Sequence, residues 1–172
     1  MKPQTASTIL IVEDDPTTCL LLDQWLRGRG FLTLLASNGD DALAQVTQQA
    51  PDLLLLDVMM PGMDGYQLAT ILKANPATAQ IPIIVLTGLP DRKARLACLA
   101  AGVEDFLLKP VDLDELALRV RNLLRLKHLG DFLLNQNHSL KKQMKAGTAA
   151  LRQLADLQAR EAGQLRGAPC KA

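Results

Sequence analysis

The 172-residue chain is long enough for one ordinary domain and a smaller second element, and 48% hydrophobic with 22% charged residues favours a packed core over wholesale disorder. A net charge of +1 gives no overall attraction to nucleic acid, and 3% aromatic residues are too few for the stacking surfaces of single-strand binders. Cys19, Cys98 and Cys170 form neither a zinc pattern nor a disulfide framework, and no apolar run indicates a membrane span or a signal peptide, so we expect a cytoplasmic protein.

Five short apolar runs, separated by segments of helical periodicity, predict a parallel sheet with helices on both faces. The runs are Thr8–Val12, Phe31–Ala36, Asp52–Leu56, Ile81–Leu86 and Asp105–Leu108. Within the third run, leucine stands at four consecutive positions, as in a strand that is buried on both faces. The expected fold is therefore a doubly wound, flavodoxin-like α/β sheet with strand order 2-1-3-4-5.

Residues that favour helix ends occur between these runs. Pro16 suits a first helical turn, and Gly30 suits the end of the helix that follows. Asn38 precedes the second helix, and Asp112 can cap the fifth. Gly102 follows the fourth helix, where we expect a left-handed backbone conformation.

The segment after residue 112 has no proline and no strand pattern up to about Leu165. A heptad that starts with Leu116 at position a places most of its Leu and Met residues in one seam. Leu126, Leu133 and Leu140 fall at d, and Asn137 falls at a. This pattern favours a parallel two-stranded coiled coil, and hence a homodimer, although internal glycines weaken the seam. An amphipathic helix that folds back on the domain is the alternative.

Carboxylates cluster where the first and third predicted strands end. Glu13, Asp14 and Asp15 follow the first strand, and Asp57 follows the third. Ligands of open parallel sheets bind beyond the carboxyl ends of the strands, and crowded acids at such a place need a cation. An oxygen-only set with few protein ligands suits Mg²⁺. Taken alone, the three consecutive acids could also be a helix N-cap before Pro16.

Two further polar residues end later strands. Thr87 closes the fourth run, and Lys109 follows the fifth. A lone Thr in such a place is usually a cap, and a lone Lys is usually solvated. Together with the acids, they supply the parts of a phosphoryl-transfer site, because an aspartate can attack phosphorus while metal, ammonium and hydroxyl neutralise the transferred oxygens.

The ordered motifs of the chain resemble those of response-regulator receiver domains. They are Ile9–Pro16, Leu56–Gly65, Val85–Gly88 and Ala101–Pro110, and the resemblance covers residues 7 to about 126. It implies that a sensor histidine kinase or phosphotransfer protein donates a phosphoryl group to Asp57, without any enzymatic activity other than self-catalysed phosphotransfer and dephosphorylation.

The resemblance also implies roles for the other residues of the site. Glu13, Asp14, Asp57 and the backbone carbonyl of Met59 would hold Mg²⁺, with Glu13 acting mainly through a metal-bound water. Lys109 would pair with the phosphoryl oxygens. Thr87 and Phe106 would form the conformational switch, and the Lys109–Pro110 bond is typically cis in the family.

We expect no DNA-reading module in the tail after the predicted receiver, because this tail offers one long helix instead of two helices and a tight turn. The helix after Leu116 resembles linkers that join receivers to cyclic-di-GMP enzymes of the HD-GYP and diguanylate cyclase types. We therefore expect an N-terminal arm at 1–7, a receiver at 8–126, a helical linker or coiled coil at 127–165 and a disordered tail at 166–172. The chain is expected to be the regulatory part of a larger cyclic-di-GMP signalling protein.

Two other functions fit part of the pattern. A haloacid-dehalogenase phosphohydrolase also uses an aspartate nucleophile and Mg²⁺, but it needs a second aspartate where Met59 stands, and its nucleophile follows the first strand. A pseudo-receiver scaffold, which takes no phosphate and acts through its coiled coil, is the remaining alternative. The complete set of acids, Thr87 and Lys109 argues against it.

Overall fold

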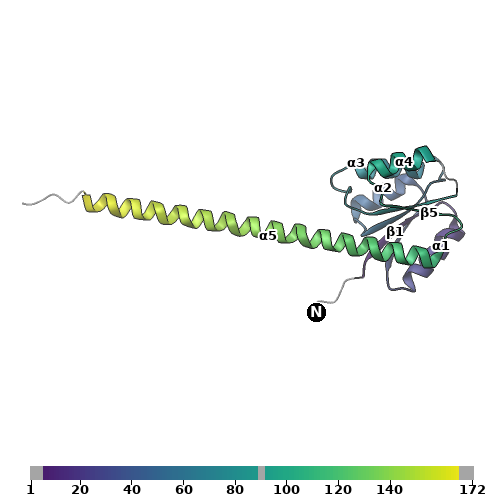
Figure 1. The fold of residues 1–172 in the computed structure, drawn as a ribbon, viewed down its shortest axis with the longest axis horizontal. Coiled ribbons are helices and arrows are strands. Elements are labelled where there is room, and N and C mark those ends of the chain that lie inside the picture. The colour runs from purple at the N-terminus through teal and green to yellow at the C-terminus, as the bar shows by residue number, and fades with distance from the viewer. Residues whose placement is uncertain (1–5, 89–91, 167–172) are drawn as a thin grey trace, which may run out of the picture. The chain divides into compact units, whose positions relative to one another are not determined.

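A five-stranded parallel sheet with strand order β2-β1-β3-β4-β5 forms the central layer of the α/β domain (Figure 1). The computed structural model describes residues 6–88 and 92–166. The strands are β1 (Thr8–Val12), β2 (Leu32–Ala36), β3 (Leu53–Asp57), β4 (Ile83–Thr87) and β5 (Asp105–Leu108). The predicted strand order is confirmed. Most of the predicted N-terminal arm and nearly all of the predicted disordered tail lie outside the described residues.

Five helices follow the strands in alternation. They are α1 (Pro16–Arg27), α2 (Gly39–Gln48), α3 (Gly65–Ala74), α4 (Arg92–Ala101) and α5 (Leu113–Arg166). Asn38 caps α2 by accepting a hydrogen bond from the backbone N–H of Asp41, as predicted. Gly102 has a φ of 103° after α4, which confirms the predicted left-handed position. Helix α1 ends at Arg27, earlier than Gly30, whose φ of 84° belongs to the turn into β2.

The sheet is buried on both faces, because alternate residues of its strands enter two separate apolar clusters. In β3, Leu54 and Leu56 face one cluster, whereas Leu53 and Leu55 face the other. The first cluster is completed by α2, α3 and α4, and the second by α1 and the beginning of α5. Figure 1 shows these helices on opposite sides of the sheet. The four consecutive leucines are explained by this double burial.

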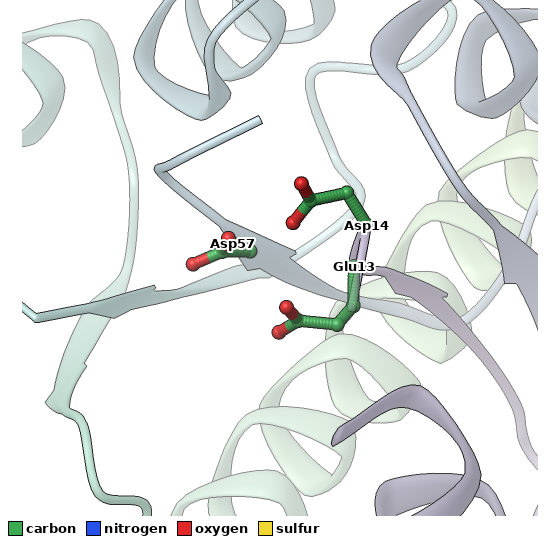
Figure 2. A group of neighbouring side chains, drawn as sticks. All are labelled: Glu13, Asp14 and Asp57. Carbon is green, nitrogen blue, oxygen red and sulfur yellow. The ribbon is translucent and has the colours of Figure 1, made fainter. Parts of the chain in front are cut away.

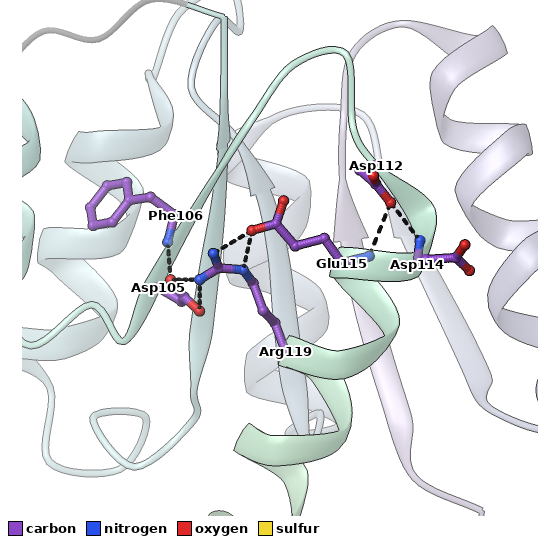
Figure 3. A network of polar contacts seen from close by, with 6 residues as sticks. All are labelled: Asp105, Phe106, Asp112, Asp114, Glu115 and Arg119. Atoms are coloured by element: carbon purple, nitrogen blue, oxygen red, sulfur yellow. Dashed lines mark hydrogen bonds and ion pairs between the residues drawn. The ribbon is translucent and has the colours of Figure 1, made fainter.

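The beginning of α5 is fixed by polar contacts to β5 and by packing. Asp112 accepts hydrogen bonds from the backbone N–H groups of Asp114 and Glu115 at 2.9 and 3.0 Å, which confirms the predicted cap (Figure 3). Arg119 bridges Asp105 of β5 and Glu115 of α5. Leu116, Val120 and Leu124 are buried in the second cluster. Leu116 therefore packs against the sheet and does not belong to the predicted coiled-coil seam.

The chain divides into two compact units, residues 1–128 and 129–172. The second unit is helical up to Arg166 and exposes large apolar side chains along the helix. Its described members are Leu129, Phe132, Leu133, Leu134, Leu140, Met144 and Leu151. The predicted long C-terminal helix is confirmed, whereas its pairing with a second copy stays a prediction. Among the described residues, no helix combines the length and the apolar character that a membrane crossing requires.

Candidate functional site

Three carboxylates from two neighbouring strands meet at the carboxyl edge of the sheet. Glu13 and Asp14 follow β1, and Asp57 is the last residue of β3, which pairs with β1. One oxygen from each lies within 4.8 Å of the others, and Figure 2 shows the side chains projecting into the same region. Glu13 and Asp57 are buried, whereas Asp14 is exposed. The parallel register thus brings together acids that are more than 40 residues apart in sequence.

Lys109 supplies the positive charge of this edge. Its Nζ lies 2.8 Å from Oδ1 of Asp57 and 2.8 Å from Oε2 of Glu13. The backbone of Lys109 is held beside β4, because its N–H donates to the carbonyl of Thr87 at 2.8 Å. One ammonium group therefore bridges two buried carboxylates that otherwise repel each other.

This crowding shifts the pKa values of Glu13 and Lys109. Burial raises the pKa of Glu13, although the Lys109 ammonium acts in the opposite direction, and the neighbouring Asp57 raises it further. Burial by itself would lower the pKa of Lys109, but its close contacts with the carboxylates of Asp57 and Glu13 outweigh that and raise the pKa. Lys109 is thus held in the charged form that stabilises an anion.

Asp15 has a different role from the two acids before it. Its Oδ2 accepts hydrogen bonds from the backbone N–H and the hydroxyl of Thr18, at 2.8 and 2.6 Å, at the start of α1. These bonds lower the pKa of Asp15. The N-cap interpretation of the acidic run is therefore right for Asp15, while Glu13 and Asp14 lie with Asp57.

The donor set fits a hard divalent cation such as Mg²⁺. All three side chains offer oxygen atoms, which Mg²⁺ prefers. Oδ1 of Asp57 is buried and has no well-directed hydrogen bond within the described part of the chain, only the ion pair with Lys109. A buried carboxylate oxygen with so few partners can accept a cation or further donors.

The residues predicted as switch elements lie on β4, which pairs with β3, and on β5, the edge strand that follows it. Thr87 ends β4 and is buried, and Phe106 lies in β5 with its ring in the first apolar cluster. The guanidinium carbon of Arg95 in α4 lies 5.1 Å from the centroid of the Phe106 ring. The Lys109–Pro110 bond is cis, as the family resemblance implied. Met59, two residues after Asp57, exposes 63% of its surface.

Gly65 is a residue of this site that the sequence analysis did not single out. A Cβ atom at Gly65 would lie 2.2 Å from the carbonyl oxygen of Asp57 and 2.9 Å from Cα of Val58. The N–H of Gly65 also donates to the carbonyl of Val58 at 3.1 Å. The first turn of α3 therefore packs directly against the backbone of Asp57. The Asp64-Gly65 pair, an N-cap residue followed by glycine, was the signal in the sequence.

Comparison with known proteins gives consistent matches over this part of the chain. The family described as "Response regulator receiver domain" matches residues 9–121. The response regulator PleD of Caulobacter vibrioides is 39% identical over 146 residues, which cover 84% of this chain and 32% of PleD. The DNA-binding response regulator MtrA of Mycolicibacterium smegmatis is 40% identical and is matched over 68% of this chain and 50% of its own. The chain thus spans half or less of these curated relatives.

Solved structures agree with the sequence matches. A putative response regulator from Chloroflexus aurantiacus is 40% identical, with a TM-score of 0.66 over 70% of this chain and 99% of its own. The signal receiver domain of a signal transduction histidine kinase from Syntrophus aciditrophicus is 41% identical, with a TM-score of 0.65 over 70% of this chain and 91% of its own. Both similarities cover the sheet and its packed helices rather than the complete chain.

Proposed function

Because the chain belongs to the response regulator receiver domain family, we propose that it accepts a phosphoryl group on Asp57 from a histidine kinase or phosphotransfer protein. Receiver domains are signalling domains and not classical enzymes. One observation carries the proposal: Asp57 ends β3 with Lys109 Nζ at 2.8 Å and with Glu13 and Asp14 beside it. Nucleophile, ammonium and acidic cluster thus occupy one edge of the sheet.

The proposed reaction transfers a phosphoryl group from an oxygen or nitrogen atom of the donor to a carboxylate oxygen of Asp57. A carboxylate oxygen of Asp57 attacks phosphorus, the new O–P bond forms, and the bond from phosphorus to the donor atom breaks with its electron pair. Lys109 neutralises negative charge on the transferred oxygens, for which its raised pKa keeps it protonated. Thr87, also at this edge, is proposed to approach the phosphoryl group through its hydroxyl.

Mg²⁺ is the proposed cofactor of this step. Glu13, Asp14, Asp57 and the backbone carbonyl of Met59 would hold the ion, Glu13 mainly through water. When bound, Mg²⁺ supplies positive charge next to the phosphoryl oxygens. The oxygen-only character of the acidic cluster supports this proposal.

The proposed output follows a continuous set of contacts from the switch to α5. The N–H of Phe106 donates to Oδ1 of Asp105 at 2.8 Å, and Asp105 also pairs with Arg119 of α5 (Figure 3). A rotation of Phe106 would therefore disturb the strand that holds the first turns of α5. Phosphorylation is proposed to shift the balance between two arrangements of this face and so to alter α5.

We further propose that the chain regulates a larger cyclic-di-GMP signalling protein through this helix. The similarity to the response regulator PleD supports a regulatory role. It extends over 146 residues and is therefore longer than the 113 residues, from 9 to 121, that the family matches. A pseudo-receiver that takes no phosphate is the alternative function. The charged bridge between Lys109, Asp57 and Glu13 favours the phosphorylated form.

Incubation with Mg²⁺ and acetyl phosphate tests the proposed phosphorylation. Intact mass spectrometry should show the gain of one phosphoryl group, because the acyl phosphate on Asp57 forms from a small donor without a kinase. The Asp57→Asn variant should show no gain, whereas Asp52→Asn, a matched acid at the other end of β3, should react normally. If neither acetyl phosphate nor any tested kinase added a phosphoryl group, the pseudo-receiver function would be favoured.

Light scattering tests the proposed coiled-coil dimer. The Leu133→Ser/Leu140→Ser variant removes two d-position leucines and should turn a dimer into a monomer. Phe132→Ser/Leu134→Ser is the control, because these side chains are as exposed as the leucines of the seam yet lie outside positions a and d. A monomeric wild-type chain, or a control variant that dissociates equally, would contradict the proposed seam.

A further inference from the structure

A pocket of about 490 Å³ lies at the edge of the sheet opposite Asp57. It is formed by the residues just before β1 and β2 and by the part of α5 that ends at His128. All its lining residues belong to the first compact unit. Small-molecule sites in proteins are commonly about 300–1,000 Å³ in volume, so the pocket is large enough for a metabolite.

The pocket combines apolar and cationic side chains, and none of the described residues that line it is acidic. Phe31 is half-buried and Leu124 is buried, and both line it. Arg121, Arg125 and His128 lie at i, i+4 and i+7 of α5, and therefore share one face of the helix. Every lining residue is neutral or basic. An anion that entered the pocket would meet donors and no opposing carboxylate.

The two arginines differ from their neighbours in having no acidic partner among the residues that the structure describes. Arg119 pairs with Asp105 and Glu115, and Arg27 pairs with Asp23, whereas neither Arg121 nor Arg125 takes part in an ion pair with another described residue. A guanidinium group matches phosphate oxygens with two parallel hydrogen bonds. Both groups are thus available for a phosphate.

Ser7 and His128 are the other polar residues that line the pocket. Oγ of Ser7 is 3.4 Å from Nε2 of His128, so the segment before β1 meets the end of the packed part of α5. A ligand in the pocket would touch both segments. Its binding would hold the last turns of α5 in this unit against the amino edge of the sheet.

From this arrangement we propose that the pocket binds a mononucleotide, a phosphate ester that carries a planar ring. The phosphate would lie between Arg121 and Arg125, with His128 and Ser7 as further donors. The ring would pack against Phe31 and Leu124. The site is separate from the proposed phosphorylation site, because the strands between the two edges, each of four or five residues, span about 15 Å.

Thermal unfolding of the full chain with GMP or AMP, in the absence of Mg²⁺, tests this site. Either nucleotide in the millimolar range should raise the Tm by a few degrees, because it binds only the folded state. Amide NMR signals of Ser7, Phe31 and Leu124 should shift, while those of Asp57 and Lys109 should not. Inorganic phosphate and guanosine, which each carry half of the ligand, should bind at least tenfold more weakly.

Paired charge variants locate the binding. Arg121→Gln/Arg125→Gln should bind the nucleotide at least tenfold more weakly, and both side chains are exposed, so the fold should be retained. Lys141→Gln/Lys142→Gln carries the same charge change on α5 outside the pocket and should bind normally. The proposal is overturned by the absence of a Tm shift with both nucleotides, by equal binding of the arginine variant, by signals that move around Asp57 instead, or by equal affinity for inorganic phosphate.

Discussion

Replacing Lys109 by methionine should slow phosphoryl transfer to Asp57 about 100-fold, because removal of one preorganised charge donor typically costs about 10²–10³ in rate. Methionine keeps much of the volume of the side chain but removes the ammonium that lies 2.8 Å from both Asp57 and Glu13. The time course of the mass gain with acetyl phosphate measures this effect. Lys127→Met is the control, since Lys127 lies on α5 outside this edge. An unchanged rate in Lys109→Met would contradict the proposed role.

The same variant should also be less stable at neutral pH. Loss of one partner leaves two buried carboxylates close together, and an uncompensated buried charge of this kind costs about 3–5 kcal/mol. Glu13 relieves part of that cost by taking up a proton, because its pKa is already above the ordinary value of 4.5. We therefore expect a loss of about 2–3 kcal/mol in urea unfolding at neutral pH.

The loss of unfolding free energy in Lys109→Met should depend on pH. A carboxyl group whose folded-state pKa is raised favours the folded state while it is protonated, below its unfolded-state pKa. This contribution disappears as the pH rises through the raised pKa of Glu13. The destabilisation of Lys109→Met should thus be larger at neutral pH than near pH 4.5. Equal destabilisation at both pH values would contradict the explanation.

Replacing Gly65 by alanine should destabilise the fold by about 2–4 kcal/mol, since overpacking against backbone is poorly relieved. The added Cβ would lie 2.2 Å from the carbonyl oxygen of Asp57, so α3 and the end of β3 must move apart. A shift of about 1 Å in Asp57, the proposed nucleophile, would be enough to slow the reaction about 100-fold. Urea unfolding and the rate of the mass gain measure the two effects.

Gly88→Ala is the matched control for that substitution. Gly88 also lies near the site, but a Cβ there would meet no atom of the described residues within 4 Å, and its φ is outside the left-handed region. We expect its stability to change by less than about 0.5 kcal/mol. If both variants behaved alike, the close approach of Gly65 to Asp57 would not be the cause.

The elements that depend on local sequence could be predicted well. Leu53–Leu56 indicated a strand buried on both faces, and Asn38 and Asp112 indicated helix starts, because these preferences act over a few residues. The predicted meeting of Glu13 and Asp57 needed one further assumption, that β1 and β3 are neighbours, which the strand order confirms.

Features that depend on distant pairing could not be predicted in the same way. Lys109 and Glu13 are 96 residues apart, and only the assembled sheet brings Nζ of Lys109 to 2.8 Å from Oε2 of Glu13. The periodicity of α5 allowed Leu116 to be read as a seam residue, whereas its burial depends on the position of the sheet. The Asp64-Gly65 pair indicated a helix start, but the close approach of Gly65 to Asp57 depends on how α3 packs against the end of β3.

Chemical trapping of the phosphorylated residue shows whether Asp57 is the phosphoacceptor. After incubation with Mg²⁺ and acetyl phosphate, borohydride reduces an aspartyl phosphate to homoserine, which tandem mass spectrometry locates in the sequence. We expect homoserine at position 57 alone, with Asp14, Asp15 and Asp64 unchanged. Homoserine at any of those positions, or an unmodified Asp57 in a protein that has gained phosphoryl mass, would contradict this expectation.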